Sequence, residues 1–232
     1  MQSPQRLARI AGLLYLAVAV LGGSAMFLRT RFYEPGDPAT TADKLTADAG
    51  LFRVAVAANL AASMCWLFTA MALYLLFKHV NANWAGAMVI FTAAGATMEL
   101  LNMAHEVLAL VLATDASGTG AFADALLLLM FDLRHYGSLI AQIFFGLWLL
   151  PMGYLAYVSR MFPRALGVLL GIGCVGWIAD TFVRLLAPNL GAALSPFLIA
   201  PAGIAEFTAI LWMIVKGVRN PSPDWSPTGE TR

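Results

Sequence analysis

The chain has 232 residues, of which 60% are hydrophobic before its 20 glycines are counted and only 12% are charged. Average soluble domains are about 45–50% apolar with glycine included and about 25% charged, so this chain has too few charged groups to cover a soluble surface. The composition and the formal net charge of +1 exclude an ordinary soluble enzyme, a nucleic-acid-binding protein and a disordered regulator. We therefore expect an integral membrane protein whose main partner is the lipid bilayer.

Six apolar runs in the sequence are long enough to cross a bilayer, whose hydrocarbon core of about 30 Å needs about 20 helical residues. They predict an all-α, polytopic membrane protein: a bundle of about six transmembrane helices in a single domain over residues 1–219. The predicted spans cover residues 7–28, 54–77, 84–112, 136–158, 165–187 and 196–215. The first run continues through Leu28 beyond the small residues Gly23 and Ala25, which favours an uncleaved helix over a signal peptide.

The segments between the spans carry turn and helix-start residues. In the longest connection, residues 29–53, the turn residues Pro35–Pro38 are followed by Thr40 and Thr41, which predicts a short surface helix. Pro163 is placed to open the fifth span. Residues 220–232 contain three prolines and no apolar period, which predicts a disordered cytoplasmic tail.

Lysine and arginine beside the spans predict the orientation in the membrane, because cytoplasmic flanks are enriched in these residues. Four basic residues lie on one side of the predicted spans and eight on the other. The side with four holds Arg29, Arg31, Lys44 and Arg53. The side with eight holds Arg6, Arg9, Lys78, Arg160, Arg164, Lys216, Arg219 and Arg232. Both termini are therefore expected in the cytoplasm.

Glycines are concentrated in the fifth span, at positions 167, 171, 173 and 176. Small residues let membrane helices approach closely, so these glycines predict close helix packing. The alternative is that they permit the helix to bend during transport.

Several short sequence segments occur in a characteristic order and spacing along the chain. They include Arg9–Leu16, Pro35–Asp37, Ala72–Leu76, Phe144–Leu147 and Pro163–Leu169. In these segments the sequence resembles the bacterial membrane-protein family known as domain of unknown function 4386, over about Arg9 to Arg219. The resemblance implies a multi-helix protein of the bacterial cytoplasmic (inner) membrane. It implies no activity, cofactor or catalytic residue.

Ionisable residues inside the spans are the candidates for function, because they are costly in a membrane and usually face the bundle interior or a water-filled cavity. Arg134 falls at the rim of the fourth span without an assigned role. The candidate ligand-binding residues are Glu99, Asn102, Glu106, His135, Asp180, Arg184 and Glu206.

Helix geometry groups these candidates. Glu99, Asn102 and Glu106 share one face of the third span at about 100° per residue. Asp180 and Arg184 are four residues apart, so they can pair directly. Most of the set falls in the outer half of the spans, which predicts one polar cavity open to the extracytoplasmic side.

The favoured function is binding, or passage, of a small or amphipathic molecule in this cavity. Glu99 and Glu206, near the middle of their spans, would bind a proton or cation. Arg184 would hold an anionic group or its counter-carboxylate.

Two other classes of function stay open. The first is a membrane-embedded metal-dependent hydrolase, because His105, Glu106, Asp132 and His135 offer nitrogen and oxygen ligands for a divalent metal. The sequence has no HExxH, HxxxH or repeated ExxH motif, so no metal or other cofactor is favoured and enzyme chemistry is the weaker hypothesis. The second is a non-catalytic scaffold or regulatory membrane partner.

Overall fold

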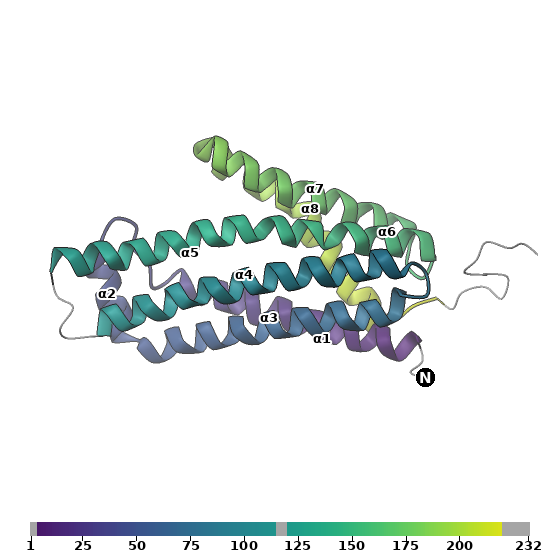
Figure 1. Cartoon of the computed structure of the whole chain (residues 1–232), viewed down its shortest axis with the longest axis horizontal. Coiled ribbons are helices and arrows are strands. Elements are labelled where there is room, and N and C mark those ends of the chain that lie inside the picture. Colours follow the sequence, from purple (N-terminus) through teal and green to yellow (C-terminus); the bar gives the residue numbers. More distant parts are fainter. Residues whose placement is uncertain (1–3, 115–119, 220–232) are drawn as a thin grey trace, which may run out of the picture. The chain divides into compact units, whose positions relative to one another are not determined.

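The computed structural model describes residues 4–114 and 120–219, so the predicted tail at residues 220–232 lies outside the described residues. Every regular element in the described part is a helix, which confirms the all-α fold class (Figure 1). The helices are α1 (Pro4–Arg29), α2 (Pro38–Ala47), α3 (Ala49–Phe77), α4 (Ala82–Thr114), α5 (Ala121–Leu147), α6 (Leu149–Ser159), α7 (Arg164–Leu186) and α8 (Pro188–Val215).

The described residues contain six helical segments that are long and apolar enough to cross a membrane. They are α1, α3, α4, α7, α8 and the segment Phe122–Ser159, which joins most of α5 to α6. Large apolar side chains such as Phe27, Phe68 and Ile90 are exposed on them, as expected of surfaces that contact lipid. The chain is a multi-pass helical membrane protein, as its composition predicts.

The helix that contains the predicted fourth span begins well before residue 136. The candidate membrane-spanning segment extends back to Phe122, so Asp132, Arg134 and His135 lie inside α5 rather than at its end. Charged residues lower the hydropathy of this stretch and so mask its helix. The charge of Arg134 is compatible with a buried helix because it is neutralised by carboxylates of α4.

The helix that contains the predicted sixth span also begins before residue 196. Ala187 closes α7 with a hydrogen bond from its N–H to the Val183 carbonyl at 2.8 Å, and Pro188 directly opens α8. Pro196 and Pro201 therefore lie inside α8. Each proline removes one backbone hydrogen bond, which membrane helices tolerate because neighbouring groups compensate.

The chain divides into two compact units, and the boundaries between them fall within α1, α3, α4 and α5. Unit 1 consists of the described residues within 1–16, 66–95 and 142–232. Unit 2 consists of the described residues within 17–65 and 96–141.

In unit 1, α7 packs closely against α6 and against α8 (Figure 1). A Cβ atom at Gly167 would lie 2.7 Å from the Gly153 carbonyl oxygen of α6, and one at Gly173 would lie 2.7 Å from the Ala202 Cα atom of α8. A Cβ atom at Gly176 would overlap the backbone of α8 in the same way, whereas Gly171 has no neighbouring atom within 4 Å. The predicted close packing is confirmed at three of the four glycines.

In unit 2, the short helix α2 confirms the surface helix predicted after the proline-rich turn. It starts earlier than Thr40, because Asp37 caps it by accepting a hydrogen bond from the Thr40 N–H at 2.9 Å. Leu45 of α2 is fully buried in an apolar cluster that includes Phe32 and Phe52, whose rings meet edge to face at 5.2 Å. This cluster anchors the long connection to the ends of α3, α4 and α5.

Candidate functional site

Four charged side chains of α1, α4 and α5 meet inside unit 2. Arg134 donates from Nε to Glu106 Oε1 at 2.8 Å, and its Nη2 lies 3.1 Å from Glu99 Oε2. Arg29, the last residue of α1, donates from Nη1 to the same Glu106 oxygen at 3.0 Å. These four residues form the arginine–glutamate network, in which two guanidinium groups balance two carboxylates.

Helix periodicity explains why one arginine reaches both carboxylates. Glu99 and Glu106 are seven residues apart, or about two turns, and so lie on one face of α4. Ser138, one turn beyond Arg134 on α5, donates its hydroxyl to Glu99 Oε1 at 3.1 Å. Glu106 is only 2% exposed and Glu99 only 8%, so the network is occluded within the helices that form it.

Three polar atoms of α4 beside this network are buried without a hydrogen-bond partner among the described residues. They are Glu106 Oε2, Asn102 Nδ2 and His105 Nδ1. The Asn102 amide lies against α5 at Gly137, where any larger side chain would overlap it. Leaving a buried polar group without a hydrogen bond destabilises the folded state by on the order of 1–3 kcal/mol. These three atoms therefore mark a part of unit 2 where the protein leaves hydrogen-bonding capacity unused.

A second polar group lies in unit 1, where the predicted pair of Asp180 and Arg184 forms. Arg184 Nη1 lies 3.8 Å from Asp180 Oδ2. The same oxygen accepts a hydrogen bond from Gln142 Nε2 at 2.5 Å. The pairing expected from the four-residue spacing on α7 is confirmed.

Glu206 of α8 belongs to a third group, also in unit 1. Its carboxyl lies near the hydroxyl of Tyr15 on α1 and the indole N–H of Trp177 on α7, and these two groups are buried without a hydrogen-bond partner among the described residues. Glu206 forms no ion pair with any of the residues that the structure describes. Six of the seven candidates thus fall into three separate groups, two of them in unit 1 and one in unit 2.

The exposed ring of His135 packs edge to face against Tyr136, with the ring centroids 5.2 Å apart. Within residues 4–114 and 120–219, no three His, Cys, Asp or Glu side chains come together as a metal site. His105, Glu106, Asp132 and His135 therefore do not assemble the ligand set that a metal-dependent hydrolase requires.

The sequence analysis missed the two arginines that hold the site together. The sequence pattern assigns Arg29 only to the flank of the first predicted span and places Arg134 at the rim of the fourth. The signal that could have found them is charge balance, because the two carboxylates of α4 need two basic partners. Both arginines lie near the ends of their predicted spans on the same side of the membrane as Glu106.

Comparisons with known proteins give a family. No solved structure matches the chain. An uncharacterized protein of Archaeoglobus fulgidus is 30% identical over 88 residues, which are 37% of this chain and 51% of that protein. The chain thus spans about half the length of this curated relative. The model of the family described as domain of unknown function (DUF4386) matches residues 10–217, nearly the whole helical part. This multi-pass helical membrane protein belongs to the family described as domain of unknown function (DUF4386).

Proposed function

We propose that this membrane protein binds a small polar or amphipathic molecule at the arginine–glutamate network, and that it does so in the cytoplasmic membrane of a bacterium with both termini in the cytoplasm. The observation that carries the proposal is Glu106 Oε2, a carboxylate oxygen that is buried without a hydrogen-bond partner among the described residues. The other oxygen of the same carboxylate accepts from two arginines.

The unpartnered atoms suggest the chemistry of the ligand. Glu106 Oε2 is an acceptor and Asn102 Nδ2 is a donor, and the two residues are four apart on one face of α4. A molecule that carries both a donor, such as an amine or hydroxyl, and an acceptor would satisfy both atoms. Because the network is already neutral, the ligand needs no net charge. The membrane-spanning helices around the site favour an amphipathic molecule.

The other candidates have different roles in this proposal. Glu99 is paired with Arg134, whereas Glu206 forms no ion pair with a basic residue among the described residues. Glu206 is therefore the carboxyl that we propose as a proton or cation site. The role that we propose for Arg184 is to balance the charge of the Asp180 carboxylate.

The test is a thermal-denaturation screen of the purified chain in detergent against small hydroxylated, amine-bearing and zwitterionic amphiphiles. A ligand at about 100 times its Kd stabilises a protein by about 2.7 kcal/mol, which corresponds to a rise in Tm of roughly 5–10 °C for a chain of this size. We expect at least one compound to give such a rise in the native protein.

Two leucine variants separate ligand binding from a scaffold role. Asn102→Leu removes the unpartnered amide beside the network and should abolish the rise in Tm. Asn59→Leu removes another buried, unpartnered amide of unit 2, outside the network, and should leave the rise intact. If no compound stabilises the native protein more than it stabilises Asn102→Leu, the network has a structural role only.

A further inference from the structure

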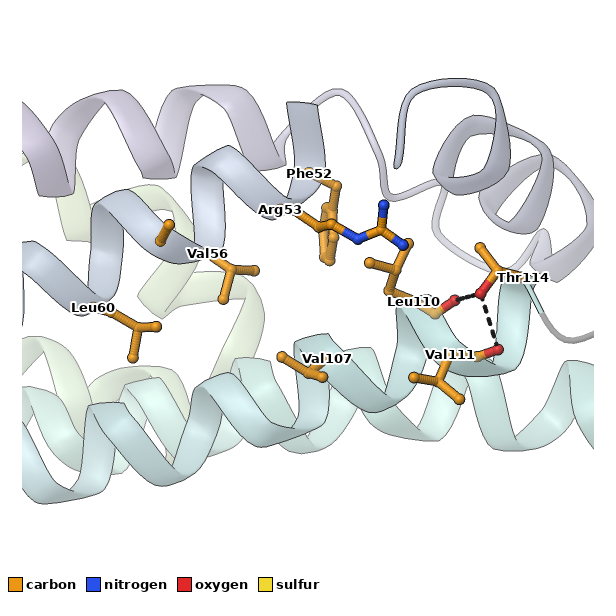
Figure 2. Close-up of a pocket in the computed structure, with 9 residues that line it drawn as sticks. Phe52, Arg53, Val56, Leu60, Val107, Leu110, Val111 and Thr114 are labelled. Carbon is orange, nitrogen blue, oxygen red and sulfur yellow. Dashed lines mark hydrogen bonds between the residues drawn. The ribbon is translucent and has the colours of Figure 1, made fainter. Parts of the chain in front are cut away.

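Unit 2 also contains an apolar groove between α3 and α4, separate from the residues of the arginine–glutamate network. Its volume is about 260 Å³. Figure 2 shows Val56 and Leu60 of α3 on one side and Val107 and Val111 of α4 on the other. Both helices are membrane-spanning candidates, so the groove walls belong to segments that are surrounded by lipid chains.

One end of this groove carries the cation Arg53, which has no counter-ion among the residues that the structure describes. Arg53 and Thr114 are the polar residues among those that line the groove, and both lie within five residues of a helix end. The Thr114 hydroxyl donates to the Leu110 carbonyl at 2.8 Å, so its hydrogen is already used (Figure 2). Arg53 is exposed and forms no hydrogen bond or ion pair with the described residues. Within the described part of the chain, the groove therefore offers the positive charge of Arg53 at its end and an apolar surface along its length.

The size of the groove restricts its occupant. Pockets that enclose a whole drug-sized ligand measure about 300–1,000 Å³, so a groove of about 260 Å³ accommodates only part of such a molecule. Arg53 and Leu60 are seven residues apart, or about 10 Å along α3. These dimensions fit a segment of one acyl chain, with the rest of the molecule in the bilayer.

We infer that this groove binds an anionic phospholipid. The phosphodiester pairs with the Arg53 guanidinium, and one acyl chain runs from there along Val56, Leu60 and Val107. Arg53 immediately precedes the predicted second span, which places its charge at the level of the headgroups. A lipid with net negative charge is preferred over a zwitterionic one because the ammonium group of a zwitterionic headgroup competes with Arg53 for the phosphate. This inference does not depend on the proposed function, since the two sites share no residue.

The test is native mass spectrometry of the full chain released from nanodiscs of equal parts phosphatidylglycerol and phosphatidylcholine. We expect the native protein to retain one phosphatidylglycerol in preference to phosphatidylcholine. Arg53→Gln should lower that retention about fivefold, the loss expected for one basic side chain at an anionic membrane surface. Ala57→Phe, which introduces a ring into the groove lining, should lower it as well.

Matched controls make the result specific to the groove. Arg31→Gln removes the same charge from a residue of unit 2 that does not line the groove, and Val54→Phe adds a ring at a neighbouring exposed position of α3. Both should retain lipid as the native protein does. Equal retention of the two lipids by the native protein, or equal losses in Arg53→Gln and Arg31→Gln, would overturn the inference. Circular dichroism verifies that each variant is folded.

Discussion

Glu106 and Glu34 both form ion pairs with basic residues of unit 2, but their surroundings differ. The side chain of Glu106 is 1% exposed and contacts two arginines, whereas Glu34 is 49% exposed and contacts Lys44 alone at 2.8 Å. Removing one partner of a buried pair leaves an uncompensated buried charge, while an exposed pair is screened by solvent. The two carboxylates must therefore contribute very different amounts to the free energy of unfolding.

We expect Glu106→Gln to lower the free energy of unfolding by about 3–5 kcal/mol, because Arg29 and Arg134 then share the single carboxylate of Glu99. Glu34→Gln should change the free energy by less than about 1 kcal/mol. Denaturation of both variants in mixed micelles, followed by circular dichroism, measures the difference. Equal stabilities for the two variants would mean that the arginine–glutamate network does not hold α1, α4 and α5 together.

Local contacts between residues could be predicted from the sequence, and distant ones could not. Asp180 and Arg184 are four residues apart on one helix, so helix geometry alone brings them together. Arg29 and Glu106 are 77 residues apart, and their contact depends on which faces of α1 and α4 meet. A single sequence contains no direct signal for that choice. The acidic half of the site was therefore predictable. For the basic half, charge balance indicates that two basic partners are needed, but not that Arg29 and Arg134 are those partners.

Among the helical elements, α7 combines two kinds of glycine. Gly176 faces the backbone of α8 at Leu198, whereas Gly171 has no neighbour within 4 Å. Alanine at Gly176 would force α7 and α8 apart, and alanine at Gly171 has free space for its methyl group. The two positions provide a matched pair within one helix.

We expect Gly176→Ala to lower the Tm clearly, since overpacking a close contact typically costs about 1–3 kcal/mol. Gly171→Ala should leave the Tm unchanged or raise it, because alanine favours helix over glycine by about 1 kcal/mol. Thermal denaturation of the two variants in the same detergent measures both effects. A similar loss of stability in both would indicate that glycine is needed for bending of α7 rather than for its packing against α8.

The start of α8 could not be chosen correctly from sequence patterns alone. Pro188 and Pro196 are both suited to open a helix, and a hydropathy pattern favours Pro196 because the apolar run is stronger after it. In the structure, α8 begins at Pro188. A Cβ atom at Gly191 would lie only 2.5 Å from the Arg184 Cα atom, so glycine is the residue that fits at this position. Tertiary packing between α7 and α8 decides the boundary.

For the whole molecule, the number of spans was predictable because the length and hydropathy of each span are local properties of the sequence. The division into two units was not, since its boundaries fall inside continuous helices such as α4 and leave no mark in composition. Orientation in the membrane rests on the asymmetry of basic residues and stays a prediction.

Cysteine labelling tests this orientation. In a chain carrying Cys65→Ala and Cys174→Ala, we expect Lys44→Cys in α2 to react with a membrane-impermeant maleimide on intact cells. Lys78→Cys, which follows α3, should react only after the cells are permeabilised. These results follow from cytoplasmic termini and an even number of spans. The reverse pattern would place both termini outside the cytoplasm.

The length of α4 has a physical consequence for the membrane that hosts the protein. Its 33 residues extend about 50 Å, and even a tilt of 40° leaves about 38 Å along the bilayer normal, against a hydrocarbon thickness of about 30 Å. At least one end of this helix therefore projects beyond the hydrocarbon core into the headgroup region. The level of Glu106 relative to the headgroups, and with it the hydration of its carboxylate, depends on the acyl-chain length of the surrounding lipids. Thin bilayers leave more turns of α4 in water, and thick bilayers draw those turns into hydrocarbon.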